Sequence, residues 1–394
     1  MKTSWKIKSL GDMCDIIGGG TPSKSNTSFY QGTIPWATVR DMGYPILDKT
    51  EFCISEEAVS NSATNIIPKG NVIIASRVGL GKVCILKNDT AINQDLRAII
   101  PKTKDLSPSF LYWWFCSIAT FILSQGKGAT VKGVTLPFLK SLTIPLPPLS
   151  EQERIVGILD AAFEKIDKLQ RNAERNLENA KELFQQVLDE ELTPKPGWKK
   201  SLLKDVSQGI TDGDHLPPPK EAKGIPFITI SNITDQQKID FSSTFFVSQK
   251  YYNSLAVIRK AQYGDILYTV TGSYGIPVLI DFNKQFCFQR HIAIIRPNIE
   301  LIDPLFLSFL LESNEIKKQA DSTATGVAQK TVSLTALRKF VLFFPSLNDQ
   351  KTIAKELMCL KNKTFEIKDK YTNIKSNCAE LKQQVLSSAF NGEL

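Results

Sequence analysis

The sequence has few of the residues from which metal sites are usually built. It contains two histidines, His215 and His291, and seven cysteines, none of them arranged as a Cys-x-x-Cys pair. A zinc site needs clustered Cys and His ligands, so we expect no metal to be bound by this chain. An odd number of scattered cysteines favours a reducing compartment in which the thiols stay free.

Long hydrophobic runs are missing as well. The longest, residues 110–123, is interrupted by Ser117 and Thr120 and falls short of the roughly 20 residues of a membrane-spanning helix. The opening residues, MKTSWKIKSLGD, have neither the apolar core nor the small-residue cleavage site of a secretory signal. We therefore expect a cytoplasmic protein with no membrane partner.

Catalytic motifs are absent or incomplete. Residues 79–82 (GLGK) resemble part of a phosphate-binding loop, but the first glycine of that motif and the Ser or Thr after the lysine are missing. No Asn/Asp-Pro-Pro-aromatic motif of an amino-methyltransferase is present. Asp212 with Glu221 and Lys223 has a nuclease-like order, although this pattern is common by chance. These absences favour a binding protein with no cofactor of its own over an enzyme.

The positive charge is divided into two blocks. The net charge of +8 consists of +6 in residues 1–150, −5 in residues 151–192, +5 in residues 193–348 and +2 in residues 349–394. Basic domains suggest a polyanionic partner, because neutralising phosphates supplies most non-specific affinity for nucleic acid. A mildly basic protein with no such partner fits the charge alone equally well.

The second half of the chain repeats the first. Residues 34–39 (IPWATV) recur as residues 225–230 (IPFITI), and residues 185–188 (QQVL) recur as residues 383–386. The offset between matching segments rises slowly from 191 and then stays at 198 from Pro147 onward. Each half therefore combines a divergent block of about 150 residues with a block of constant length of about 45 residues.

The constant blocks have the apolar spacing of long heptad helices. In the first block the predicted seam consists of Ile155, Leu159, Ala162, Ile166, Leu169, Ala173, Asn176, Ala180, Leu183 and Val187. In the second it consists of Ile353, Leu357, Leu360, Thr364, Ile367, Tyr371, Ile374, Cys378, Leu381 and Val385. Acidic residues dominate the first block and basic residues the second, which favours pairing of the two with each other. About 40 residues at 1.5 Å each give a rod of roughly 60 Å, although heptads alone leave parallel and antiparallel pairing open.

The divergent blocks are predicted to be mixed α/β domains. Segments rich in Val and Ile predict strands at residues 71–76, 83–86, 98–100, 227–230, 265–271 and 292–295, and a helix follows each of Pro108 and Pro304. We place the first domain at residues 1–147, the first helix at 148–193, the second domain at 194–345 and the second helix at 346–394.

Glycine-rich polar loops between these elements carry the residues best suited to touch DNA. Long donors on such loops can reach base edges and phosphates. The candidates in the first half are Lys24, Arg77, Lys82, Lys127 and Lys132, and those in the second half are Thr271, Ser273, Tyr274, Arg290, Gln329 and Lys330. Solvated loops with no ligand are the alternative for each of them.

The sequence resembles the DNA-specificity subunits of Type I restriction–modification systems over essentially its whole length. The resemblance rests on residues 142–160 (LTIPLPPLSEQERIVGILD), the heptad block after them, the copy that ends QQVLSSAFNGEL, and the repeated Ile-Pro-x-x-Thr and Gly-Asn/Asp-Val/Ile segments. The second copy departs from the pattern at residues 344–350 (FPSLNDQ), where one Pro and the Glu are lost.

The resemblance implies an α+β chain with a pseudo-two-fold internal repeat. Two homologous target-recognition domains are held by two long helices that form an antiparallel coiled coil, and each domain reads one half of a bipartite double-stranded DNA target. The helices dock two modification subunits, which use S-adenosylmethionine and methylate adenine. Two restriction-translocase subunits, which use ATP and Mg, join them, and the specificity subunit is itself non-catalytic.

Two other classes of protein remain open from the sequence. One is a single-chain DNA methyltransferase or nuclease with duplicated recognition domains, which S-adenosylmethionine binding by the isolated chain would favour. The other is a coiled-coil adaptor without a nucleic-acid role, which a strongly salt-dependent affinity for DNA would exclude. In the restriction–modification interpretation the helices act as a ruler, and one added heptad in each would lengthen the gap in the target by about three base pairs.

Overall fold

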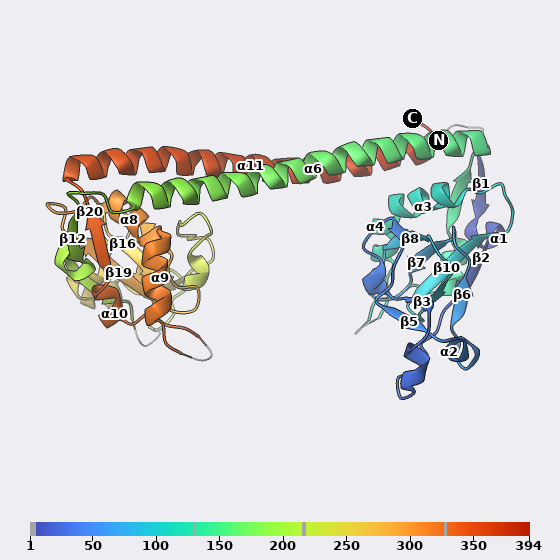
Figure 1. The fold of residues 1–394 in the computed structure, drawn as a ribbon, viewed down its shortest axis with the longest axis horizontal. Helices are drawn as coiled ribbons and strands as arrows, with labels where there is room; N and C mark the ends of the chain where they lie inside the picture. The colour runs from blue at the N-terminus through green and yellow to red at the C-terminus, as the bar shows by residue number, and fades with distance from the viewer. Residues whose placement is uncertain (1–4, 129–130, 215–217, 327–328) are drawn as a thin grey trace. The chain divides into compact units, whose positions relative to one another are not determined.

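The computed structural model describes residues 5–128, 131–214, 218–326 and 329–394. It divides into two compact units, residues 1–172 with 373–394 (unit 1) and residues 173–372 (unit 2). Each unit contains one mixed α/β head and a stretch of each of two long helices, α6 (Leu149–Leu192) and α11 (Leu347–Asn391) (Figure 1).

The head of unit 1 contains two sheets and a two-stranded ribbon. The larger sheet has the order β2 (Cys14–Gly18), β10 (Leu96–Pro101), β7 (Val72–Ala75), β8 (Val83–Leu86), β4 (Ile46–Leu47). The smaller has the order β5 (Phe52–Ile54), β3 (Ile34–Ala37), β9 (Thr90–Ile92), β6 (Asn65–Ile67), and the ribbon pairs β1 (Lys6–Ser9) with β11 (Thr143–Leu146). Its helices are α1 (Leu10–Met13), α2 (Glu56–Ser60), α3 (Pro108–Ser117), α4 (Ala119–Ser124), α5 (Leu136–Ser141) and the 3₁₀ turns η1 (Thr27–Tyr30) and η2 (Val39–Asp41).

The head of unit 2 is built in the same way. One sheet has the order β13 (Ser207–Asp212), β19 (Ile292–Pro297), β16 (Ile266–Thr269), β17 (Pro277–Leu279), and the other β15 (Phe245–Val247), β14 (Ile225–Ile228), β18 (Cys287–Phe288). The ribbon pairs β12 (Lys199–Leu202) with β20 (Val341–Phe344). The helices are α7 (Gln249–Ser254), α8 (Pro304–Glu312), α9 (Asn314–Thr323), α10 (Leu334–Arg338), η3 (Leu203–Val206), η4 (Ile230–Asn232) and η5 (Val257–Arg259).

Strand registers confirm the internal repeat. Pro35 pairs with Cys53 in antiparallel β3 and β5, and Pro226 pairs with Phe246 in antiparallel β14 and β15. The same central strands also run parallel to a third strand, β9 in unit 1 and β18 in unit 2. Strands β4 and β6 have no counterpart among the described strands of unit 2. All six predicted strands and the helices after Pro108 and Pro304 are present, with ends that differ by a few residues.

One apolar helix in each head lies between the larger sheet and the long helices. In unit 1, Phe110 and Leu111 of α3 are fully buried with Ile99 of the sheet, Leu159 of α6 and Phe390 of α11. In unit 2, α8 supplies Phe306 and Phe309 to the equivalent core. The smaller sheet of unit 1 lies farther from the long helices, so its loops are free for another role (Figure 1).

The two long helices pack antiparallel in both units, as expected. In unit 1, the ammonium of Lys382 in α11 pairs with the carboxylate of Asp167 in α6, and the backbone carbonyl of Leu394 accepts a hydrogen bond from Arg154 at 2.9 Å. In unit 2, the hydroxyl of Tyr371 donates to Glu174. Residue numbers rise along one helix as they fall along the other, which settles the direction that the spacing left open.

The predicted seam of α6 is wrong at three of its ten positions, although Ala173, another of the ten, is buried as predicted. Leu169 and Leu183 are 51% and 53% exposed, and Asn176 is exposed. The best-buried series instead recurs every eleven residues: Ile155, Ile166, Leu177 and Leu188. An interval of eleven is close to the natural period of an α-helix, whereas a heptad repeat requires underwinding. In α11, Leu381 is likewise 45% exposed, although Cys378 is buried as predicted.

A buried glutamine fixes each long helix to its head. Gln152, which is fully buried, donates to the carbonyls of Asp105 and Pro147 and accepts from the Ser107 N–H at 2.9 Å. Gln350 does the same in unit 2, donating to the carbonyls of Leu301 and Pro345. All these partners are main-chain groups, so this glutamine can be kept while the surrounding sequence diverges.

Replacing either glutamine is expected to destabilise its unit strongly. In Gln152→Ala the Ser107 N–H and two carbonyls lose their buried partner, which costs about 2–4 kcal/mol. Gln186→Ala, at an exposed position of the same helix, serves as the matched control and should change stability by less than about 0.5 kcal/mol. Urea unfolding of the full chain measures both, and equal midpoints for the two variants would contradict the role of the buried amide.

Candidate nucleic-acid interface

The loops with predicted DNA-binding residues converge beside the parallel strand pair of each head. In unit 1, β3 and β9 run parallel and end at Ala37 and Ile92, so the segments after them, which contain Thr38 and Asn93, emerge together. The glycine segment 18–20 lies against this edge, because a Cβ on Gly19 would be 2.0 Å from the carbonyl oxygen of Ile92. Gly213 makes the same close approach to Phe288 in unit 2.

Main-chain hydrogen bonds join three loops of unit 1 into one surface. The N–H groups of Ser76 and Arg77 both donate to the carbonyl of Asp95, at 2.8 and 3.2 Å. The N–H of Val134 donates to the carbonyl of Ser76, and Lys127 exchanges two hydrogen bonds with Gly133. The loop after β7, the turn after β9 and the paired residues Lys127 and Gly133 are thereby held together.

Unit 2 repeats this arrangement with different side chains. The N–H of Val270 donates to the carbonyl of His291, and the N–H of Val332 donates to the carbonyl of Val270. Thr325 exchanges two hydrogen bonds with Thr331, as Lys127 does with Gly133. The backbone scaffold is therefore constant while the presented side chains vary, which is the arrangement expected of a surface that reads different sequences.

All five candidates in unit 1 are exposed, and Lys24, Lys127 and Lys132 have no side-chain partner among the described residues. Arg77, Lys127 and Lys132 lie on the joined loops, and Lys24 lines a cavity of about 670 Å³ next to them. Arg77 is also 3.7 Å from the carboxylate of Asp95. Lys82 is engaged internally, because its ammonium donates to the carbonyl of Val39 at 3.2 Å. A role of these residues in DNA binding stays a prediction.

The candidates in unit 2 are divided in the same way. Thr271, Arg290 and Gln329 line a cavity of about 420 Å³, and Lys330 is exposed beside it. Ser273 is exposed in the loop after β16, and its carbonyl accepts a hydrogen bond from Thr269. The hydroxyl of Tyr274 donates to the carboxylate of Asp321 at 2.7 Å, so this side chain holds α9 to the loop instead of pointing freely outward.

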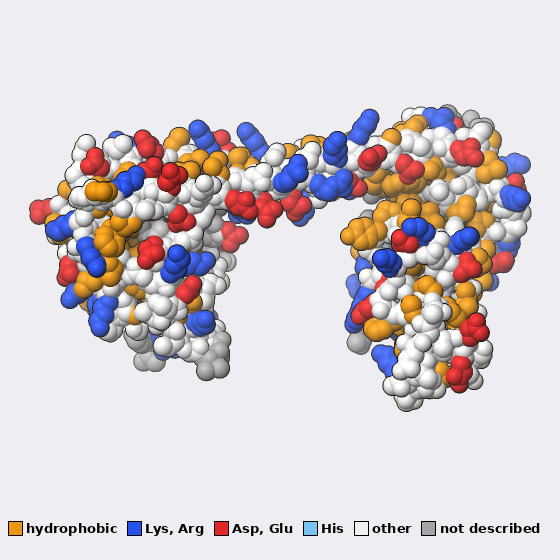
Figure 2. All heavy atoms as spheres, in the orientation of Figure 1, with side chains coloured by type: hydrophobic (Ala, Val, Ile, Leu, Met, Phe, Trp, Pro, Cys, Tyr) orange, Lys and Arg blue, Asp and Glu red, His pale blue; other side chains and the backbone are white. Residues whose placement is uncertain are grey.

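The positive charge of this surface comes from lysine and arginine. Lys24, Lys127, Lys132, Arg290 and Lys330 make no ion pair within the described part of the chain. Partial burial, and next the charge of Arg290, lower the pKa of His291, so the imidazole is neutral at pH 7. Along the visible faces of α6 and α11, by contrast, basic and acidic side chains are interspersed (Figure 2).

Neither a metal centre nor a membrane helix occurs in the part of the chain that the structure covers. No three His, Cys, Asp or Glu side chains cluster there as metal ligands. Across the same residues, no helix combines the length and apolar character that a bilayer crossing needs.

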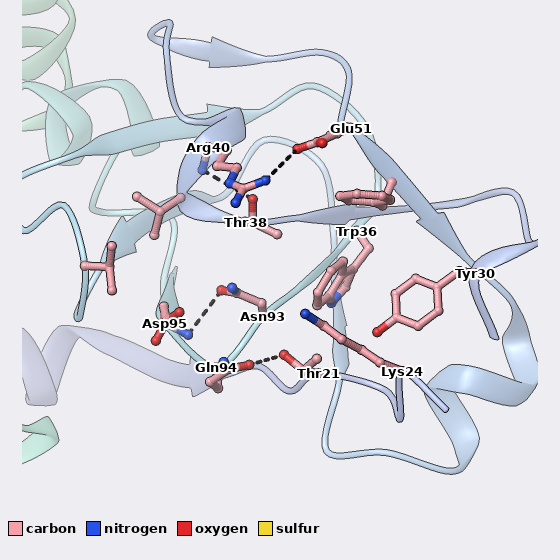
Figure 3. A pocket seen from close by; sticks show the side chains of 13 residues that line it. Thr21, Lys24, Tyr30, Trp36, Thr38, Arg40, Glu51, Asn93, Gln94 and Asp95 are labelled. Atoms are coloured by element: carbon pink, nitrogen blue, oxygen red, sulfur yellow. Dashed lines mark hydrogen bonds and ion pairs between the residues drawn. The ribbon is translucent and has the colours of Figure 1, made fainter. Parts of the chain in front are cut away.

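The sequence interpretation missed most of the cavity in unit 1. Trp36, Tyr30, Asn93 and Gln94 line it together with Lys24 (Figure 3). Asn93 and Gln94 belong to a segment that recurs in the second half, which could have marked them as part of the site. Trp36 and Tyr30 could not be separated from core aromatics by any sequence pattern.

A family model described as "Type I restriction modification DNA specificity domain" matches residues 2–179 and 195–375, one match in each repeat. The chain belongs to this family of specificity domains. The MjaIX specificity subunit of Methanocaldococcus jannaschii is 28% identical over 287 residues, and the EcoR124I/EcoR124II specificity subunit of Escherichia coli is 37% identical over 185 residues. These matches cover 64% and 45% of this chain, and 65% and 45% of the respective relatives.

Two solved structures share the fold. A chain from a type I restriction–modification system superposes with a TM-score of 0.81 at 21% identity, over 100% of this chain and 99% of that one. The HsdS subunit of Thermoanaerobacter tengcongensis gives a TM-score of 0.60 at 20% identity, over 100% and 98% of the two chains. The predicted fold class is thereby confirmed: two mixed α/β repeats with two long antiparallel helices.

Proposed function

We propose that this chain is the DNA-specificity subunit of a Type I restriction–modification complex and that each head reads one half of a bipartite target. One observation carries the proposal: two heads of similar topology present equivalent loop surfaces with different side chains. A duplicated scaffold with divergent loops suits an asymmetric target better than a palindrome, because the two half-sites meet different side chains.

The long helices are proposed to set the gap between the half-sites. They are continuous over 44 and 45 residues, which at 1.5 Å per residue is about 66 Å of helix. Antiparallel pairing and the buried glutamines hold each head to this pair. The length of the helices then limits the distance along the DNA between the two half-sites that one molecule can contact at once. Equivalent faces of B-DNA recur every ~34–36 Å, so this distance also decides which face of the duplex the second half-site presents.

The proposed role is non-catalytic and depends on partners. Two modification subunits dock on the helices and use S-adenosylmethionine, and two restriction-translocase subunits use ATP and Mg. The chain itself holds no cofactor and acts in the cytoplasm on double-stranded DNA. The family membership and the incomplete catalytic motifs support this division of labour.

Removing two lysines from the loop surface of unit 1 is expected to weaken DNA binding at every sequence. In Lys127→Ala/Lys132→Ala, up to two phosphate contacts are lost, so the slope of log K against log salt falls by up to about 2. Lys6→Ala/Lys8→Ala removes the same charge from exposed positions on β1 and is the matched control. Fluorescence anisotropy of the assembled complex at several salt concentrations measures both, and equal losses would place the DNA elsewhere.

A further inference from the structure

The cavity in unit 1 has the lining of a site for a flat aromatic ligand. Its volume of about 670 Å³ lies within the range of small-molecule sites. Trp36 and Tyr30 meet edge to face, with ring centroids 5.9 Å apart, and form one wall. Lys24 extends alongside these two rings (Figure 3).

Both rings are held in place from behind. The indole N–H of Trp36 donates to the carbonyl of Gly20 at 3.2 Å, and the hydroxyl of Tyr30 donates to the carbonyl of Pro22 at 2.8 Å. The polar atoms of the rings are thus satisfied by the backbone of one loop. Trp36 is 6% exposed and is buried with Phe29, Ile54 and Ala91, so a small part of its ring is left for stacking, together with the half-buried ring of Tyr30. Rigid aromatic surfaces of this kind lose little entropy when a base stacks on them.

Free hydrogen-bond donors surround the rings. Asn93 accepts from the N–H of Asp95 and Gln94 accepts from the hydroxyl of Thr21, which leaves the amide nitrogens of both side chains without a partner among the described residues. The ammonium of Lys24 is also free there. Three donors suit a base whose edge carries carbonyl acceptors, as thymine and guanine do.

In the second repeat, two stacked phenylalanines occupy the position of the aromatic wall. Phe227 occupies the position of Trp36, and its cross-strand neighbour Phe245 stacks on it with ring centroids 4.7 Å apart and an interplanar angle of 20°. The ammonium of Lys220 lies 4.8 Å over the ring of Phe245. In unit 1 the paired residues Trp36 and Phe52 make no such stack, and both line the cavity. The open aromatic wall is therefore a feature of the first repeat only, among the residues described.

Val78 stands in a strained conformation at the edge of this cavity. Its φ is +37°, a conformation that β-branched residues rarely adopt, yet its side chain is 50% exposed and gains little burial in return. It lines the cavity from the loop after β7, which also carries Arg77. Apolar side chains in such positions are used by DNA-bending proteins to fill a gap between base pairs.

We infer that the cavity of unit 1 takes up one nucleobase, a thymine or a guanine, that leaves the stack of the first half-site, while Val78 fills the space left in the duplex. This inference rests on the proposed function, since it places DNA against the same loops. The base stacks on the Trp36–Tyr30 wall, and Lys24, Asn93 and Gln94 donate to its carbonyl edge. The second repeat reads its half-site without an equivalent step.

Mismatched duplexes test this inference with the assembled complex. The base opposite each position of the first half-site is changed in turn, which lowers the cost of extracting the base without changing the base itself. If the head only contacts base edges in the grooves of an intact duplex, every mismatch should weaken binding or leave it unchanged. Uptake of one base predicts that a mismatch at one thymine or guanine position strengthens binding at least tenfold.

Three variants test whether the gain in affinity from the mismatch depends on the cavity. In Trp36→Leu the gain is expected to fall below twofold, whereas Phe227→Leu, at the repeated position in unit 2, should keep it in full. Val78→Gly removes the side chain where the backbone favours glycine, so it should fold normally and lose most of the gain. A base extracted by a partner subunit would give a gain that persists in Trp36→Leu.

The outcomes separate the two proposals. If no position of the first half-site shows the gain, or if Trp36→Leu keeps it, the cavity does not take up a base. Loss of binding in Lys24→Met at all sequences, with a lower salt slope and no mismatch gain, would identify the occupant as a backbone phosphate and overturn the inference. A complex with no preference for any two-part target over random duplex would overturn the proposed function itself.

Discussion

Inserting 22 residues into both α6 and α11 is expected to abolish binding to the native target and to create binding to one whose gap is about ten base pairs longer. Twenty-two residues add about 33 Å of helix, which is close to the ~34–36 Å of one turn of B-DNA. The second half-site then returns to the same face of the duplex. Specific affinity for the original gap should fall to the non-specific level, a loss of about 10³-fold or more.

The observed packing of α6 dictates the size of the insertion. Buried residues recur every eleven positions, from Ile155 to Leu188, so two such intervals keep the buried face in line. Tyr371 contacts Glu174, which places opposed insertion points near residues 172 and 374. An insertion of eleven residues in each helix is the matched control, because it adds only about half a turn of DNA. That variant should bind neither gap well.

Selection from a library of duplexes with variable gaps measures both variants. Equal preference of the 22-residue variant and the wild-type chain for the native gap would contradict a ruler. Insertion into α6 alone leaves its buried face without a partner and should lower the unfolding midpoint, which checks that the helices work as a pair.

Exchange of residues 1–147 for the first head of another specificity subunit is expected to change one half of the target only. The native target should lose its specific affinity, again about 10³-fold or more, while the second half-site and the gap stay the same. The reason is that each loop surface is built within one head, in unit 1 from the hydrogen-bonded residues Ser76, Arg77, Asp95, Lys127 and Gly133. A change in both halves after the exchange would contradict independent reading.

The junction determines how such a hybrid should be made. Gln152 contacts main-chain atoms only, so it accepts any head with the same backbone at Asp105 and Ser107. Trp113 restricts the choice of donor head more, because its side chain contacts side chains of α6. Its indole N–H donates to the carboxylate of Asp160 at 2.9 Å, and its ring centroid lies 4.4 Å from that of Phe163. A donor head with Trp at this place is the better choice. A hybrid with Ala there should bind the new half-site more weakly although its reading loops are intact.

Much of the fold could be predicted because repetition removes ambiguity. The strand predicted at residues 71–76 and its repeat partner at residues 265–271 both form, as β7 and β16, so each supports the assignment of the other. The helix seam was harder, since Leu169 and Leu183 fit a heptad as well as Leu177 and Leu188 fit an eleven-residue interval. Only packing against the heads decides between them: Phe184 and Leu188 are buried with Phe309, whereas Leu183 stays exposed.

The candidate site was predictable in its loops and not in its details. Glycine-rich segments marked the regions that converge, and Arg77 and Lys127 do lie on joined loops. Sequence could not show that the ammonium of Lys82 is taken by the carbonyl of Val39 or that Tyr274 is held by Asp321, because both contacts join distant segments. The aromatic cavity was missed for the same reason, since Trp36 and Tyr30 line it together with Asn93 and Gln94, which are far away in the sequence.

Mapping of methylated adenines in the genome of cells that carry the complete system tests the central claim most directly. Two heads that read independently on a fixed helix pair predict one asymmetric motif with two specified parts and a constant gap. A single uninterrupted motif, a palindrome, or a gap that varies from site to site would contradict the account.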